Sequence, residues 1–328
     1  MCIIKNSSFI NSKGENIVCN KNGSYRVSPE NLDEAYYRER TDRNIGWITR
    51  EEQEMVHRSV IGVAGCGGMG GALAEKFVRL GVGELRIADR EVFDVSNINR
   101  QFGARRLTVG NSKADETARL LRGITDDFAL GVFPGGICEA TVDEFVRGCD
   151  MVCDEIEFWC VGARILLHER ARKANVPVFV CNTIGFGSHV FLFTPTSGTM
   201  EECLCMDLST ARTLEARIMN GVATSEDVEF VMHAMVRGLF PEWREYVADR
   251  SPEQGNAFLV KRLFAETKGA IIATNPPLAC GFVADRVLLY LLQRSPLKRA
   301  VVEMPEMPGY LYLDAATMEA KIKRGAWW

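Results

Sequence analysis

The sequence GVAGCGGMGGALAEKF, residues 62–77, lies between an apolar run and a stretch with helical periodicity. It carries the spacing Gly-x-Gly-x-x-Gly at Gly65, Gly67 and Gly70, with Gly68 inside it. This spacing lets a strand turn sharply into a helix, whose first N–H groups can then bind a phosphate. A dinucleotide and ATP both fit such a loop, so the loop by itself leaves the identity of the phosphate open.

Strands and helices are predicted to alternate around this loop. Apolar runs predict five strands, at 59–65, 84–89, 128–134, 150–155 and 176–182. Helical patterns separate them, at 70–81, 112–124, 141–148 and 161–175. Alternation at this spacing implies right-handed crossovers and a mostly parallel sheet with helices on both faces. We therefore expect an α/β fold of the doubly wound, Rossmann-like class, with a helical insertion and a small mixed C-terminal extension.

The composition narrows the class of protein. The chain has 328 residues, 47% of them hydrophobic, and a net charge of −4, which argues against a dedicated nucleic-acid binder. Its longest apolar region, 269–293, contains Asn275 and Asp285 and is expected to be a buried helix rather than a membrane span. Eleven cysteines occur without a Cys-x-x-Cys pair. We expect reduced thiols, a cytoplasmic location and no four-cysteine zinc site.

The residues beyond the second predicted strand favour ATP. Asp89 ends that strand, where a carboxylate can bind the hydroxyls of a ribose. Asn97, Arg100 and Gln101 follow within twelve residues, and Lys113 comes next. Two cations beside a phosphate site suit a triphosphate, whose oxygens need charge neutralisation as pyrophosphate leaves. The clustering favours this interpretation over a solvated basic surface.

Three strings carry a resemblance to a known family. GCGGMGG (65–71), ADREVFDVSNINRQF (88–102) and VGNSKAD (109–115) closely resemble the ThiF/MoeB family, bacterial relatives of ubiquitin-activating enzymes. The resemblance extends over about residues 36–292. It implies an enzyme that binds ATP and Mg²⁺, adenylates the C-terminal carboxylate of a small ubiquitin-like or sulfur-carrier protein, and releases pyrophosphate.

The resemblance also implies roles for individual residues. The ATP phosphates would lie against Gly65, Gly67, Gly68 and Gly70, and the ribose against Asp89. The triphosphate would contact Asn97, Arg100, Gln101 and Lys113. YRERTDRNIGW (37–47) is similar to the family's amino-terminal arginine motif, in which an arginine reaches the γ-phosphate in the neighbouring subunit. Arg43 matches that arginine, so a homodimer is expected.

These implied roles divide the chain into four parts. Residues 1–48 form an N-terminal extension with the arginine motif, of which 1–35 is expected to be polar and irregular. Residues 49–194 form the ATP-binding adenylation core, ending in a sixth strand that can be antiparallel. A helical insertion covers 195–256. The C-terminal part, 257–328, is expected to hold a helix at 276–293, strands at 300–305 and 310–314, and a surface helix at 315–328.

Two features depart from the family pattern. The family has a magnesium-binding aspartate after the fourth strand, where VCDEIEFWCVGAR (152–164) places Glu157. Either Glu157 binds the metal, or Asp154 contributes, or the metal site is weakened. Family members that form a thioester use a cysteine in the region of Cys203 and Cys205. Acidic neighbours disfavour a thiolate there, so we expect adenylation without a thioester.

Alternatives remain both for the identity of the acceptor and for the class of activity. The acceptor can be a carrier protein with a flexible Gly-Gly tail or a ribosomal peptide, as in microcin-type relatives. The negative net charge of the chain makes tRNA a less favoured acceptor. A non-catalytic scaffold subunit is a different interpretation, which the Glu157 departure supports and the ATP residues oppose. An NAD-dependent oxidoreductase is the least favoured interpretation.

Overall fold

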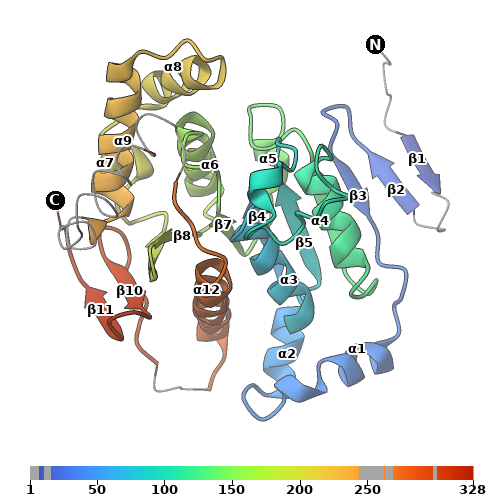
Figure 1. The fold of residues 1–328 in the computed structure, drawn as a ribbon. Helices are drawn as coiled ribbons and strands as arrows, with labels where there is room; N and C mark the ends of the chain where they lie inside the picture. The colour runs from blue at the N-terminus through green and yellow to red at the C-terminus, as the bar shows by residue number, and fades with distance from the viewer. Residues whose placement is uncertain (1–6, 11–15, 244–261, 263–268, 298–300, 328) are drawn as a thin grey trace.

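The computed structural model describes residues 7–10, 16–243, 262, 269–297 and 301–327. Within them a single sheet of eleven strands runs through the molecule (Figure 1). Its parallel centre has the order β6-β5-β4-β7-β8. The bounds of these strands are β4 (Val60–Ala64), β5 (Glu84–Ala88), β6 (Ala129–Phe133), β7 (Met151–Asp154) and β8 (Val178–Ile184). The predicted doubly wound α/β fold is confirmed.

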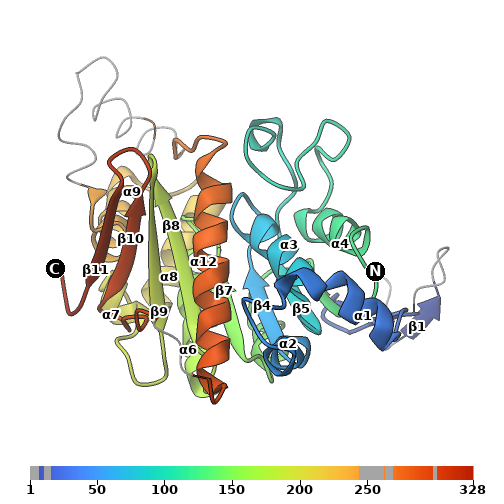
Figure 2. The ribbon, with the colours of Figure 1, turned by 90° about the horizontal axis from the view of Figure 1, so that it is seen from below.

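Helices cover both faces of this sheet (Figure 2). One apolar core lies under α2 (Arg50–His57), α3 (Gly70–Leu80), α4 (Lys113–Arg122) and α12 (Asn275–Leu291). The other lies under α5 (Val142–Val146), α6 (Val161–Lys173), α7 (Met200–Leu204), α8 (Leu208–Met219) and α9 (Ser225–Leu239). Because both faces are buried, β4 and β6 are apolar throughout rather than alternating, whereas β5 includes the partly exposed Glu84 and Arg86.

The order of the strands creates one crevice at the sheet edge. β4 pairs with β5 on one side and with β7 on the other, so the loops after β4 and β7 diverge to opposite faces. In open α/β sheets, ligands bind at this switch point outside the carboxyl ends of the strands. The glycine loop follows β4 and the segment containing Glu157 follows β7. The topology therefore brings the two motifs together.

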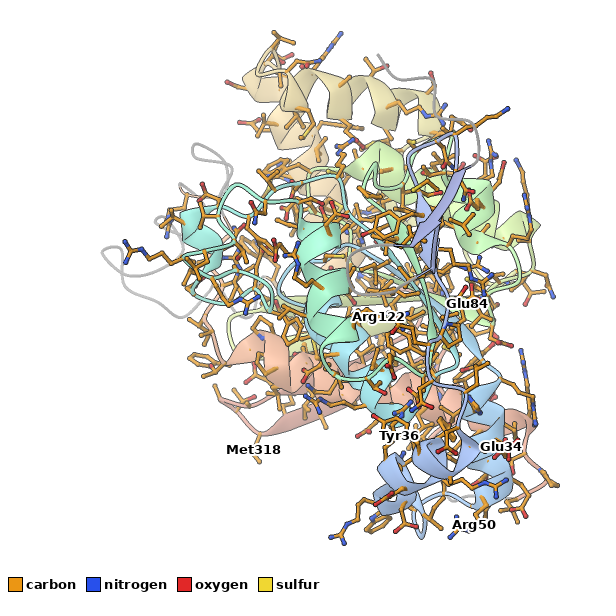
Figure 3. The ribbon with its side chains drawn as sticks, turned by 90° about the vertical axis from the view of Figure 1, so that its right-hand side faces the viewer. Glu34, Tyr36, Arg50, Glu84, Arg122 and Met318 are labelled. Atoms are coloured by element: carbon orange, nitrogen blue, oxygen red, sulfur yellow. The ribbon has the colours of Figure 1, made fainter. Side chains whose placement is uncertain are left out.

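The N-terminal region differs from the prediction. Residues 1–35 were expected to be irregular, but β1 (Ser7–Ile10), β2 (Asn16–Cys19) and β3 (Tyr25–Val27) extend the sheet as antiparallel strands. β3 pairs with β6 and thereby provides hydrogen-bond partners for the edge strand of the parallel sheet. A run of three residues in the sequence cannot reveal a pairing with so distant a strand. Arg122 of α4 donates a hydrogen bond to the carbonyl of Ser28 (2.5 Å) and ties this extension to the core (Figure 3).

Two short helices follow the N-terminal strands. Residues 34–44 form α1 (Glu34–Arg40) and the short helix η1 (Asp42–Asn44). Thr49 caps α2 in a reciprocal arrangement with Glu52. The insertion is helical from α7 to α9, as expected, and the remainder of its predicted range, 244–256, lies outside the described residues.

The C-terminal part confirms some expectations and corrects two. β9 (Gly187–Phe193) is antiparallel to β8, and β10 (Tyr310–Asp314) pairs with β9. Residues 301–305 are not a strand, because β10 occupies the edge of β9 that they would need. The tail forms β11 (Glu319–Lys323) instead of a surface helix. The carboxylate of Asp314 accepts hydrogen bonds from the next N–H groups and turns the chain back into this hairpin.

No helix in the described part of the chain is long and apolar enough to cross a membrane.

Candidate active site

A pocket of about 430 Å³ opens at the carboxyl ends of β4, β7 and β8. This volume is typical of small-molecule sites. Its wall includes the glycine loop, the crossover after β5, the segment after β7, the end of β8, and residues of α9 and α12. Of the residues predicted from the sequence, it is lined by Gly67, Gly68, Arg100, Gln101 and Glu157.

The glycine loop has the backbone that the sequence predicts. Gly65 has a φ of +106°, and a Cβ there would lie 2.1 Å from the carbonyl oxygen of Glu155. A Cβ on Gly70 would lie 1.9 Å from the carbonyl oxygen of Gly65. These two positions require glycine, and they let the loop pass close to the strand β7. Met69, the N-cap residue of α3, makes no side-chain cap hydrogen bond, and the N–H of Gly71 in the first turn donates to the carbonyl of Gly67 (3.2 Å). The N-terminus of a helix in such a loop favours an anion.

The crossover after β5 positions two polar side chains against this loop. Its short helix η2 (Val95–Asn97) ends at Asn97, whose carbonyl accepts hydrogen bonds from the N–H groups of Arg100 (3.0 Å) and Gln101 (2.9 Å). The side chain of Asn97 accepts from the N–H of Asp94 (3.0 Å). Asn97 therefore stabilises the turn that carries Arg100 and Gln101, and it does not itself line the pocket.

Charged groups lie directly behind the glycine loop. Asp89 accepts hydrogen bonds from the N–H groups of Cys66 (2.7 Å) and Glu91 (2.8 Å). Lys113 begins α4, is only 4% exposed, and its ammonium lies 2.7 Å from the carboxylate of Glu91. Burial lowers the pKa of Lys113, but the carboxylates of Glu91, Asp89 and Glu157 outweigh burial and raise it. Lys113 is therefore a fixed cation.

Glu157 is the carboxylate that reaches the pocket. Its side chain is exposed to the pocket, but the surrounding walls displace bulk water. This desolvation, together with the nearby Glu91 carboxylate, raises the pKa of Glu157, and Lys113 and Arg100 oppose the shift. A carboxylate with a raised pKa is one that a bound cation would stabilise.

Asp154 has a different environment. It is 0% exposed, and its Oδ2 lies 3.1 Å from Nη1 of Arg164 and 2.9 Å from Nε2 of His168. Burial raises the pKa of Asp154, but these two partners outweigh burial and hold it below its usual value. Asp154 does not line the pocket, so a metal in the pocket would meet Glu157 instead.

Arg43 lies far from the pocket within its own chain. It is exposed on η1, and the next residue, Asn44, donates to the carbonyl of Leu80 (3.3 Å) at the C-terminal end of α3. The glycine loop is at the other end of this helix, about 16 Å away for eleven residues. Figure 2 shows the crossover of residues 90–112 at the top and α2 at the bottom, and Figure 3 shows Glu34 and Arg50 together beside this lower end.

Several pocket residues were not predicted from the sequence. They contribute an aromatic wall and buried polar groups, namely Glu155, Phe158, Arg164, Asn182, Phe240 and Trp243. Glu91, the partner of Lys113, was also missed. Their signals are weak, since a lone acid or a helical arginine has no characteristic spacing. Only the tertiary arrangement brings them together.

The two candidate thioester cysteines lie in different environments. Cys203 is fully buried and donates to the carbonyl of Gly238 (3.3 Å), and burial raises its pKa. Cys205 is exposed, and its sulfur lies 2.6 Å from Nη1 of Arg237, a cation that the local sequence does not reveal. Neither cysteine lines the pocket.

The described residues do not by themselves form a complete metal site. The described part of the chain contains no group of three or more His, Cys, Asp or Glu side chains that could hold a metal ion. Mg²⁺ in nucleotide sites is commonly bound by one or two carboxylates plus phosphate oxygens and water. Glu157 beside the glycine loop fits that smaller requirement.

Solved structures share this fold. PaaA superimposes with a TM-score of 0.59, covering 91% of this chain and 87% of that one at 16% identity. E. coli MccB with ATP gives a TM-score of 0.58, covering 91% and 75% at 14% identity. At these identities the likeness shows the fold alone.

Curated sequences share the region of the glycine loop. The adenylyltransferase and sulfurtransferase MOCS3 of Mus musculus is 29% identical over 43% of this chain and 30% of its own length. The sulfur carrier protein ThiS adenylyltransferase of Bacillus subtilis is 27% identical over 43% and 42%. The tRNA threonylcarbamoyladenosine dehydratase of B. subtilis is 31% identical over 42% and 53%. Each match spans about half of the relative or less.

A family model covers far more of the chain. The model of the ThiF family matches residues 41–322, which include the glycine loop, the crossover, the segment after β7, α12 and the C-terminal hairpin. The expected resemblance is thereby confirmed. The chain belongs to the ThiF family.

Proposed function

We propose that the protein is an ATP-dependent adenylyltransferase that activates the C-terminal carboxylate of a small protein or peptide. The observation that carries this proposal is the meeting of the glycine loop, Arg100, Gln101 and Glu157 in one pocket of a ThiF-family chain. The names of relatives such as the ThiS adenylyltransferase support the same chemistry. An oxidoreductase would not need cations beyond the ribose carboxylate.

The proposed reaction is a nucleotidyl transfer. An oxygen of the acceptor carboxylate attacks the α-phosphorus of ATP, and the bond from that phosphorus to the bridging oxygen of pyrophosphate breaks. No general base is needed, because a carboxylate is ionised at neutral pH. Arg100 and Lys113 would stabilise the negative charge on the phosphates, and Asp89 would orient the ribose.

Magnesium would be held by Glu157. When bound, the ion would neutralise phosphate charge, as Mg²⁺ does in other nucleotide sites. Asp154 is a poor second ligand, because its carboxylate is paired with Arg164 and His168 under the pocket floor. We expect Glu157→Gln to weaken Mg²⁺ binding, measured by titration of Mn²⁺ in its place, while Asp154→Asn should act on stability.

A homodimer would complete the site through Arg43. Its own chain holds Arg43 at the far end of α3, so only a second copy can bring it to the phosphates. Two inactive variants, Arg43→Ala and Arg100→Ala, test this directly when they are mixed. Random pairing predicts recovery of about one quarter of the wild-type activity, because half of the dimers each contain one intact site. Activity that stays absent on mixing would contradict a role in trans.

Pyrophosphate exchange tests the proposed function. Incubation with ATP, Mg²⁺, labelled pyrophosphate and candidate acceptors should return label to ATP, and Arg100→Ala should abolish this exchange. Candidate acceptors are small proteins that end in Gly-Gly and short ribosomal peptides from neighbouring genes. Failure to bind ATP at all would favour a scaffold subunit. Tight binding of NAD that ATP does not displace would favour an oxidoreductase.

A further inference from the structure

A short segment before α12 contributes to the wall of the pocket. It has the sequence GAIIAT, residues 269–274, and we call it the strap. Its first four residues, 269–272, line the pocket together with the glycine loop and Arg100. Figure 2 shows the start of α12 and the crossover after β5 at the same end of the sheet. None of the strap residues belongs to the motifs that predicted the nucleotide site.

The strap is fixed firmly where it joins α12. Asn275, the first residue of that helix, is 3% exposed. Its Nδ2 donates to the carbonyls of Gly185 (2.7 Å) and Gly187 (3.2 Å), and its Oδ1 accepts from the hydroxyl of Ser188 (3.3 Å). Breaking such bonds would leave buried polar atoms unpaired, which is costly. This end of the strap is therefore anchored on the turn between β8 and β9.

A second contact holds the middle of the strap. Nδ2 of Asn99, in the crossover after β5, donates to the carbonyl of Ile271 (3.1 Å), across 172 positions of sequence. Asn99 is exposed. An exposed hydrogen bond opens more readily than a buried one, because water can replace either partner. The position of the strap on the crossover therefore depends on how firmly Asn99 itself is held.

Arg100 orients the side chain of Asn99. Oδ1 of Asn99 accepts from Nη1 of Arg100 (2.8 Å), and the same nitrogen donates to the carbonyl of Ser96 (3.1 Å). With its oxygen bound to Arg100, the amide presents its nitrogen to the strap. One side chain thus joins the cation of the crossover to the wall formed by residues 269–272.

Arg100 is also placed to meet a phosphate. A Cβ on Gly68 would lie 3.6 Å from Cγ of Arg100 and 3.5 Å from Cγ of Pro276, so Arg100 packs beside the glycine loop near the start of α12. Burial lowers the pKa of Arg100 and Glu157 opposes the shift, but a guanidinium stays charged. Both hydrogen-bond acceptors of Nη1 are uncharged oxygens. A phosphate would bind this cation more strongly and would immobilise it.

We infer that Asn99 is a positioning residue that couples nucleotide binding at Arg100 to the strap, so that the strap is held more firmly when ATP is bound. This inference rests on the proposed function, because it needs the phosphates of ATP at Arg100. A strap held in this way limits the access of water to the bound nucleotide. Coupling between two sites is reciprocal, so the contact between Asn99 and the strap also strengthens ATP binding.

Hydrogen exchange followed by mass spectrometry tests the coupling in the full chain. In wild type, saturating ATP with Mg²⁺ should slow exchange of the strap amides at least about threefold. Asn99→Leu removes both hydrogen bonds, and Asn99→Asp keeps an oxygen for Arg100 but removes the donor to Ile271. In both variants ATP should leave the exchange of the strap unchanged. A purely structural effect would shift the free and bound states of a variant equally, so the readout is the difference between them.

Calorimetric titration of ATP with Mg²⁺ measures the other direction of the coupling. Asn99→Leu should raise the Kd of ATP about threefold, the same factor that ATP exerts on the strap. Asn220→Leu, at an exposed position at the end of α8, is the matched control. It should keep both the wild-type Kd and the ATP-dependent protection of the strap. The melting temperature of each variant checks folding.

The outcomes separate the inference from the proposed function. If ATP binds wild type but does not slow exchange of the strap, the inference is overturned and adenylation stands. Slowing by ATP that persists in Asn99→Leu or Asn99→Asp also overturns it, because another contact would then carry the coupling. If wild type does not bind ATP, the proposed function fails and the inference fails with it.

Discussion

The two sides of the pocket are built in different ways. On the glycine-loop side, the functional groups come from residues 65–113, and nearby residues position them: Asn97 holds the turn of Arg100, and Glu91 pairs with Lys113. On the side of β7 and β8, Glu155, Arg164 and Asn182 come from different elements, and each has one buried side-chain atom that makes no hydrogen bond within the described residues. The first side has preset charges suited to a fixed ligand. The second depends on contacts between elements that are separate in the sequence.

Asp154 and Glu155 show the contrast at single-residue scale. They are adjacent in sequence, yet the first is fully paired and has a lowered pKa, whereas the second has an unpaired oxygen and a raised pKa. Successive residues at a strand end point to opposite faces, so only one of the two meets the buried arginine. The same backbone segment therefore supplies an ion pair on one face of the sheet and, on the other face, a carboxyl beside the buried thiols of Cys153, Cys181 and Cys280.

Asp154→Asn should have the largest effect on stability. Breaking a buried pair leaves Arg164 incompletely compensated, which costs about 3–5 kcal/mol. The pKa of Asp154 is lowered in the fold, so its contribution is complete above the unfolded pKa of about 3.9 and is lost as the pH falls through the folded value. Urea denaturation at pH 7 and pH 3 measures this. Asp143→Asn, at an exposed pair with Arg170, should cost less than about 1 kcal/mol.

Gly65→Ala tests whether the glycine loop must lie directly against the carbonyl of Glu155, at the end of β7. The new Cβ would meet the carbonyl of Glu155 at 2.1 Å in addition to its strained φ, so we expect a loss of about 3 kcal/mol and no measurable ATP binding. Gly148 also has a positive φ of +72°, but a Cβ there would meet nothing within 4 Å. Gly148→Ala therefore measures the conformational cost alone, which we expect to be about 1 kcal/mol of stability. Equal losses in the two variants would contradict the close contact.

Lys113→Met tests the charge on the glycine-loop side. Its long apolar side chain fills the buried position while removing the cation next to Glu91 and Glu157. We expect pyrophosphate exchange to fall about 10²-fold, which is typical when one group that stabilises phosphate charge is removed. Lys76→Met, on the exposed side of α3, is the control and should exchange at the wild-type rate. Unchanged exchange in Lys113→Met would show that Lys113 only pairs with Glu91 and does not stabilise the charge of the phosphates.

Glu155→Gln tests the protonation of this buried carboxyl through pH. The folded pKa of Glu155 is raised, so between its unfolded value of about 4.3 and its folded value the native state binds the extra proton. Wild-type stability should therefore fall as the pH rises through this window, and the variant should lack this part of the slope. Denaturation at a series of pH values measures it. Parallel pH curves for wild type and Glu155→Gln would be evidence that the carboxyl is already charged.

Cys205→Ser should have the smallest effect. Cys205 lies outside the pocket, and the proposed reaction needs no thioester, so exchange should stay within twofold of wild type. Mass spectrometry of a trapped reaction with the acceptor should find no thioester on this residue. A covalent adduct that disappears in Cys205→Ser would require a second chemical step.

The sequence predicts the glycine-loop side well because its signals are local. Spacing alone identified the loop of Gly65 and Gly70, and strand-helix alternation identified the sheet that places it. The predictions failed where a partner distant in sequence decides the structure: β3 becomes a strand by pairing with β6, and β11 by pairing with β10. Arg164 and Asn182 escaped for the same reason. A buried polar residue acquires its meaning from contacts that no periodicity encodes.

The affinity for ATP in two variants tests the division of the pocket most directly. Calorimetric titration of ATP with Mg²⁺ into wild type, Arg100→Ala and Asn182→Asp compares one residue from each side under the same conditions. The account predicts that Arg100→Ala weakens ATP binding at least about tenfold, whereas Asn182→Asp leaves it within twofold. Equal weakening in the two variants, or unchanged binding in Arg100→Ala, would contradict the assignment of the nucleotide to the glycine-loop side.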